Sequence, residues 1–174
     1  MTGVRVGHAL HDLVRHNIWA TEQVLTCCRG LDEQMLNATV PGTYGTIIVT
    51  LRHMIGSEES YLRRLTGAWV ATPWPDDDAV GLSVLAERAA MLANVWEQFL
   101  LMDEVDTERM GEGRGDDGSI FAIRASIFYT QALHHANEHR AQICTIIGAH
   151  GLEAPDVSAW GYALASGRSM LTSN

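Results

Sequence analysis

The 174-residue sequence has few basic residues, only three cysteines and no long uninterrupted apolar segment. Twelve lysines and arginines stand against 21 aspartates and glutamates, and the formal net charge of −9 argues against binding nucleic-acid phosphates. No run approaches the ~18 consecutive apolar residues of a membrane span, and the opening MTGVRVGHALHDLVRHN lacks the apolar core of a signal peptide. The three cysteines, two of them adjacent, suit a reducing compartment better than a disulfide framework. We therefore expect a protein of the cytoplasm that contacts neither nucleic acid nor membrane.

Apolar residues at three- and four-residue spacing, typical of amphipathic helices, dominate the rest of the chain. They predict four long helices at about residues 8–31, 46–66, 82–103 and 126–149. The glycine-rich stretch ERMGEGRGDDGSIFAIRAS predicts a long loop or a short hairpin before the fourth helix. The closing APDVSAWGYALASGR predicts a short terminal helix with Asp156 or Ser158 near its cap. We predict a single all-α domain over residues 1–174, built as a four-helix bundle.

Two histidines lie on the apolar stripe of the fourth predicted helix, in the stretch QALHHANEHRAQI. His139 falls about 40° from His135 on a helical wheel. Side chains four residues apart can hold one ion between ring nitrogens at about 2.0–2.1 Å, so this spacing suits a metal clamp. Packing without a metal is the alternative, although both imidazoles have polar nitrogens that need partners in a core. His134 and His150 are expected to have no role.

A catalytic metal site usually has three protein ligands, and the second predicted helix offers the third. Glu58 lies at the centre of its apolar stripe, where a carboxylate is costly unless it is paired, protonated or bound to metal. His53 lies about 140° from the centre of that stripe. By itself the wheel therefore favours a site of His135, His139 and Glu58, and it places His53 on the flank.

The first predicted helix contains a rival set, His8, Asp12 and His16, at spacings of four residues. The apolar stripe of this helix consists of Leu10, Leu13, Val14, Asn17, Val24 and Cys28. Because the rival set points away from that stripe, we expect it to face solvent and bind nothing. Trp19 shares this outer side, so it is expected to mark a subunit contact.

The stretches HNIWATEQVL, PGTYGTIIVTLRHMIGSEESYL and HHANEHRAQI follow one another as in the DinB/YfiT-like superfamily, which the chain resembles over most of its length. The resemblance implies a four-helix bundle, usually a homodimer, with one divalent metal ion. Its motif positions make His53, His135 and His139 the ligands and move Glu58 to a supporting or proton-handling role. The chain departs from the pattern at Ala141, where glycine is frequent, and at Gln131, where some members have histidine.

The resemblance also implies an activity, because family members with assigned activities are similar to thiol-dependent S-transferases and isomerases. We expect a small-molecule substrate, Zn²⁺ or Ni²⁺ at the three histidines, and a low-molecular-weight thiol such as bacillithiol or mycothiol as cosubstrate. A metal ion lowers the pKa of a bound thiol, and Glu58 would handle the proton. Trp69, Trp74 and Phe128 are candidates for an apolar wall. A hydrolase with the same ligands and a non-catalytic metal-binding stress-response dimer remain alternatives.

Overall fold

The computed structural model describes residues 6–66, 74, 80–102, 106, 108–115 and 117–170. These residues are mostly helical, as predicted. The elements in chain order are α1 (Val6–Cys28), α2 (Glu33–Leu36), α3 (Ile47–Thr66), α4 (Leu82–Leu100), β1 (Met110–Arg114), β2 (Ile120–Arg124), α5 (Ala125–Ala149) and α6 (Ala159–Ala165). The sequence did not predict the one-turn helix α2, and α1 ends three residues earlier than expected.

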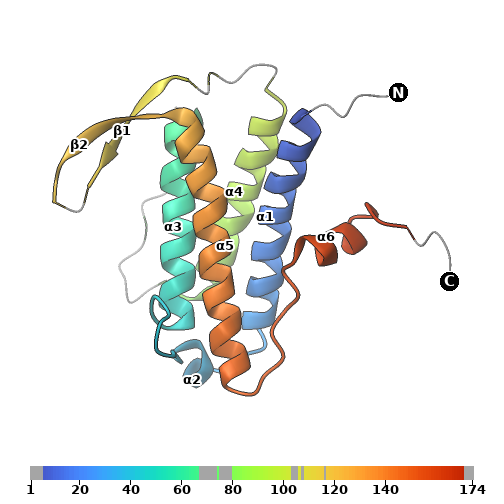
Figure 1. The fold of residues 1–174 in the computed structure, drawn as a ribbon. Helices are drawn as coiled ribbons and strands as arrows, with labels where there is room; N and C mark the ends of the chain where they lie inside the picture. Colours follow the sequence, from blue (N-terminus) through green and yellow to red (C-terminus); the bar gives the residue numbers. More distant parts are fainter. Residues whose placement is uncertain are drawn as a thin grey trace.

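The four long helices lie side by side, and each contacts two of the others (Figure 1). Helix α3 packs against α5 and α4, and α1 packs against the same two helices from the other side. The apolar stripe predicted for α3 is buried throughout and consists of Ile47, Leu51, Met54, Leu62 and Leu65. Burying one such side chain is worth about 1.5–3 kcal/mol, so these stripes stabilise the helical arrangement. The core also contains Trp96, which is fully buried.

Helix α3 begins where the sequence predicts, because Thr46 caps it. The Thr46 hydroxyl oxygen accepts a hydrogen bond from the amide of Val49 at 3.3 Å, which satisfies a donor at the start of the helix. On α1 the predicted stripe is wrong at its first two positions. Leu10 is 42% exposed and Leu13 is 52% exposed, and burial among the described residues of α1 starts at Val14.

The glycine-rich stretch forms a hairpin, the second of the two predicted outcomes. Strands β1 and β2 pair antiparallel, with Met110 opposite Arg124 and Arg114 opposite Ile120. At the turn the amide of Gly115 donates to Ser119 O, and Gly118 has a φ of 82°, which favours glycine. The hairpin projects beside the helices and leads directly into α5 (Figure 1).

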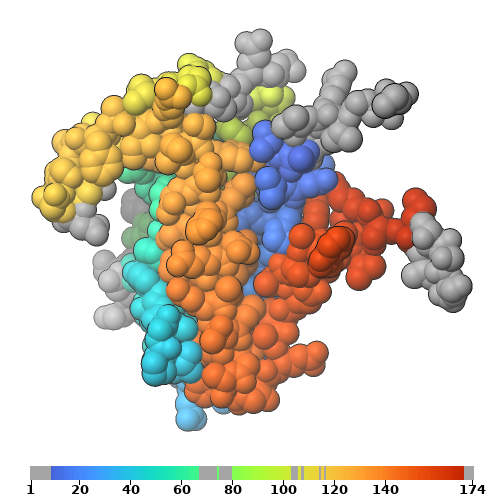
Figure 2. Space-filling model, in the orientation of Figure 1, coloured from blue at the N-terminus to red at the C-terminus, as the bar shows by residue number. Residues whose placement is uncertain are grey.

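The C-terminal segment lies against the outer side of α1 (Figure 2). Ser158, one of the two residues predicted near the cap, is the N-cap of helix α6. Its side chain accepts a hydrogen bond from the amide of Gly161. The Arg168 guanidinium donates to Asp12 at 2.6 Å, and His16 Nε2 lies 2.9 Å from the carbonyl oxygen of Val157.

These contacts correct the expectation that the outer side of α1 faces solvent. Asp12 and His16 are engaged by the C-terminal segment, and the side chain of His8 lies outside the described residues. The ring of Trp19 lies 5.8 Å from the ring of Tyr162 in α6. The aromatic that was expected to mark a subunit contact therefore packs within its own chain. Within the described ranges, no helix is both long enough and apolar enough to cross a membrane.

Candidate metal centre

Helices α3 and α5 bring His53, His135 and His139 together. His135 Nε2 lies 3.0 Å from His53 Nε2 and 3.1 Å from His139 Nε2. Ligand atoms of all three residues lie within 4.8 Å of one another. Around a tetrahedral ion with nitrogens at about 2.0–2.1 Å, ligand nitrogens are about 3.3 Å apart, so the spacing of these rings suits one metal ion. His53 comes from the second turn of α3, and the other two lie one turn apart on α5.

Contacts outside the cluster set the tautomer of His139. Its Nδ1 lies 3.0 Å from Gln142 Oε1, and the backbone amide of Tyr44 lies 3.2 Å from the same oxygen. A backbone amide only donates, so the shared Gln142 atom is an acceptor and His139 Nδ1 must donate to it. Neutral His139 therefore has its lone pair on Nε2, the nitrogen that faces His135. A histidine that ligates a metal commonly has its other ring nitrogen fixed in this way.

The other two histidines are held neutral by their surroundings. Burial, followed by the nearby His139 ring, lowers the pKa of His53. Burial, the His139 ring and the His53 ring together lower the pKa of His135 to about 4. Imidazole binds a metal only when it is neutral, so at pH 7 both rings have the required protonation state.

The aromatic rings of two tyrosines contact the histidines. The ring of Tyr44 stacks on His53 with 4.1 Å between centroids, and the ring of Tyr61 meets His135 edge-on at 5.8 Å. Sequence reasoning assigned no role to Tyr44 or to Gln142. The spacing of Gln142, three residues after His139 on one helix face, is a signal that could have identified it. Tyr44 precedes α3, and helical spacing gives no signal for it.

An open depression of about 470 Å³ adjoins His53. Its lining includes Tyr44, Arg52, Ser57 and Trp74. The Arg88 guanidinium lies 4.3 Å from the Trp74 ring centroid and forms a buried ion pair with Glu59 at 3.1 Å. Trp74 lines the depression next to the cluster, and its role as an apolar wall stays a prediction.

Of the other two wall candidates, Phe128 is not among the residues that line this depression. Phe128 is buried and packs beneath the hairpin at Gly111 and beside Arg64. Trp69 lies outside the described residues. Among histidines away from the cluster, His134 is exposed, and the exposed His150 has its Nδ1 2.8 Å from Ile146 O at the end of α5.

Glu58 lies outside the three-histidine group, contrary to the wheel's preferred set. Its Oε1 accepts from Asn17 Nδ2 at 2.7 Å and from Trp96 Nε1 at 2.6 Å. Asn17 Oδ1 in turn accepts from Arg140 at 2.7 Å. Burial raises the pKa of Glu58, although the bonds from Trp96 and Asn17 and the charge of Arg140 act in the opposite direction. These bonds link α3 to α1 and α4.

The structure therefore defines a helical protein with a three-histidine group that can hold a metal ion. The sequence model of the DinB family matches residues 6–167, and the chain belongs to this family. A search among curated proteins found no match to the chain.

Proposed function

We propose that the protein is a metal-dependent enzyme that uses Zn²⁺ or Ni²⁺ at His53, His135 and His139 to transfer or isomerise a substrate with a low-molecular-weight thiol. One observation carries the proposal: three imidazoles meet through their Nε2 atoms beside an open depression. The part of the chain that the structure describes offers three nitrogen ligands and no fourth ligand, which is typical of catalytic rather than structural sites.

A bound divalent ion would supply the positive charge that lowers the pKa of a thiol beside it. The protein's own groups hold this site in shape. Gln142 fixes the His139 ring, and Tyr44 covers His53 by stacking. Trp74 offers an apolar surface to an electrophilic substrate, and Arg52 brings a positive charge to the lining.

For Glu58 we propose a positioning role in place of the proton-handling role that the resemblance implies. Its hydrogen bonds go to Asn17 and Trp96, and Asn17 continues to Arg140, the residue that follows His139. A buried network of this kind fixes how α5 sits against α1 and α3. We expect Glu58→Gln to retain its metal.

We also propose that the four long helices constitute a four-helix bundle, which their pairwise contacts support. The homodimer and the cytoplasmic location stay predictions from the sequence. Light scattering during size-exclusion chromatography would measure the mass in solution, and a mass near the chain's 19.1 kDa would exclude the dimer.

Elemental analysis of protein purified without a histidine tag tests the metal site. We expect about one metal ion per chain in the parent. His53→Ala, His135→Ala and His139→Ala should each lose most of it. Two matched controls, His134→Ala on α5 and His150→Ala directly after its end, remove exposed histidines and should retain the metal. Stoichiometric metal in all three ligand variants would refute the assignment.

Thiol chemistry is tested separately on the metal-loaded parent. Bacillithiol, mycothiol or glutathione is offered together with an aromatic chloride, and loss of thiol is followed with time. Consumption that needs both the metal and His135 supports thiol transfer. Metal binding without thiol consumption, but with hydrolysis of an ester or amide, would favour the hydrolase alternative.

A further inference from the structure

A second cavity, of about 300 Å³, lies between α1 and α4, and none of the three histidines lines it. Small-molecule sites start at about this volume. Its lining includes Ile18 and Leu25 from α1, Glu58 from α3, and Ala86, Ala89 and Ala93 from α4. The alanines of α4 leave room that larger side chains would fill, so the cavity is mostly apolar with one buried carboxyl group.

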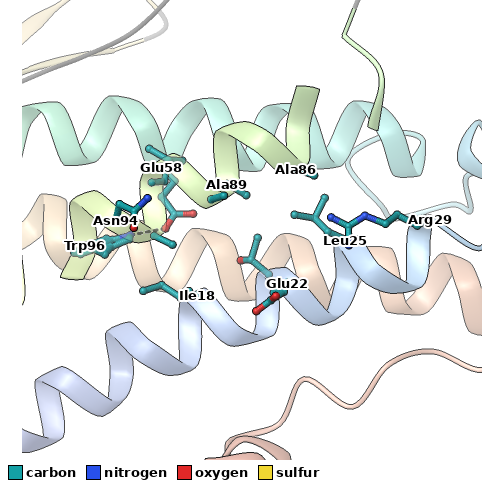
Figure 3. Close-up of a pocket in the computed structure, with 13 residues that line it drawn as sticks. Ile18, Glu22, Leu25, Arg29, Glu58, Ala86, Ala89, Asn94 and Trp96 are labelled. Carbon is teal, nitrogen blue, oxygen red and sulfur yellow. Dashed lines mark hydrogen bonds between the residues drawn. The ribbon is translucent and has the colours of Figure 1, made fainter. Parts of the chain in front are cut away.

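Glu58 is 4% exposed and is directed into this cavity (Figure 3). Both of its hydrogen bonds within the described part of the chain, from Asn17 and Trp96, go to Oε1. The second oxygen has no partner among these residues and points along the cavity toward Ala89 (Figure 3). This oxygen lines the cavity and is therefore the acceptor of the Glu58 carboxyl group that a ligand in the cavity can reach.

The polar groups of the lining favour a cationic partner. Its ionisable side chains are the exposed Glu22 and Arg29 and the buried Glu58, which makes two carboxyl groups against one guanidinium. Burial also leaves the Glu58 carboxylate poorly stabilised, since its pKa is raised despite two hydrogen bonds and the Arg140 charge. A donor with a positive charge at Oε2 would supply the stabilisation that the protein groups do not.

We propose that this cavity binds a short aliphatic molecule with a terminal protonated amine, whose N–H donates to Glu58 Oε2 while its carbon chain contacts Ile18 and the alanines of α4. The site is separate from the three histidines and does not depend on the function proposed for them. Trp96 lines the cavity and donates to Glu58 through its indole N–H, so it reports on occupancy.

The test uses n-butylamine as the probe at pH 7, with the purified, metal-loaded protein. The indole ¹⁵N–¹H resonance of Trp96, assigned by its loss in Trp96→Phe, is followed during titration to about 100 mM, since so small a ligand is expected to bind in about the millimolar range. We expect a saturable shift with n-butylamine and none with butyrate, which has the opposite charge at the same length. No saturable shift, or equal binding of butyrate, would overturn the proposal.

Variants locate the binding. Ala89→Leu fills the cavity and should abolish the shift, and Ala86→Leu, one turn earlier, is a second filling variant. Ala141→Leu is the matched control, because Ala141 is exposed on α5, which contributes nothing to the lining. Glu58→Gln keeps an oxygen for Asn17 and Trp96 but replaces the second one with an amide donor, so binding should weaken at least about tenfold.

One further variant separates this site from the metal centre. An amine could also coordinate a metal, and that binding would disappear in His135→Ala, whereas binding in the cavity should be unchanged there. Binding that survives Ala89→Leu and Ala86→Leu, or that is lost in His135→Ala, would refute the cavity site. The metal content of Ala89→Leu, measured in parallel, shows whether the proposed metal function stands or fails independently.

Discussion

Protein stripped of metal should lose stability as the pH falls, and His135 should account for a defined part of the loss. In the folded state burial and the rings of His139 and His53 lower the pKa of His135 to about 4. In the unfolded chain its pKa returns to about 6.5. At a pH between these two pKa values, His135 is protonated in the unfolded chain and neutral in the folded chain. Lowering the pH through this range therefore favours unfolding.

The magnitude follows from the size of the pKa difference. About 2.5 pH units at about 1.4 kcal/mol each give about 3 kcal/mol, fully present above pH ~6.5 and lost by pH ~4. Glu58 acts with the opposite sign. Its pKa is raised in the folded state, so its protonation stabilises the fold as the pH falls. Because the pKa of His53 is also lowered, the total slope mixes at least three groups, and a comparison with a His135 variant is needed to isolate the contribution of His135.

The assay is urea unfolding, followed by circular dichroism, of metal-free parent and metal-free His135→Gln across pH 7 to pH 4. Relative to the variant, the parent should lose about 3 kcal/mol of its free energy of unfolding over this range. His150→Gln, which removes an exposed histidine at the end of α5, should follow the parent. Parallel curves for parent and His135→Gln would show that His135 is not held neutral by the fold.

Three other predictions concern stability. Trp96→Phe removes the indole donor to buried Glu58 and should lower the free energy of unfolding in urea by about 1–3 kcal/mol. Arg88→Met leaves Glu59 as an unpaired buried charge and should cost about 3–5 kcal/mol, whereas Arg168→Met breaks a partly exposed pair and should cost no more than about 1 kcal/mol. Metal at about 100 times its Kd should raise the free energy of unfolding of the parent by about 2.7 kcal/mol and leave His139→Ala unchanged, which thermal melts with and without metal would show.

Helical periodicity predicted the long helices and the inward position of His135 and His139, but it misplaced His53. A single stripe centre assumes that a helix has one buried direction. Helix α3 packs against two long helices, α4 and α5. Glu58 bonds toward α4 and α1, while His53, about 140° away, meets α5. The helical wheel gave one mean direction for the two buried sides of α3, so it placed His53 on the flank. Only the family resemblance pointed to His53 as a ligand.

The covering of α1 by the C-terminal segment could not be predicted from periodicity. His16 and Val157 are 141 positions apart, and a pattern within one helix holds no information on so distant a partner. The same holds for Tyr44 and Gln142, which are 98 positions apart and meet only after α3 and α5 have packed. Local spacing predicts the faces of helices, and tertiary packing decides what each face meets.

The separation of the histidines along the chain also sets when the metal centre can form. His53 precedes His135 by 82 positions. At about 5–20 residues per second, a ribosome would make His53 roughly 4–16 s before its partner. A nascent chain has one of the three imidazoles through that interval, and the cluster closes only after α5 has emerged and docked on α3. Metal capture would thus be a late step in biogenesis, restricted to chains whose last long helix has been completed.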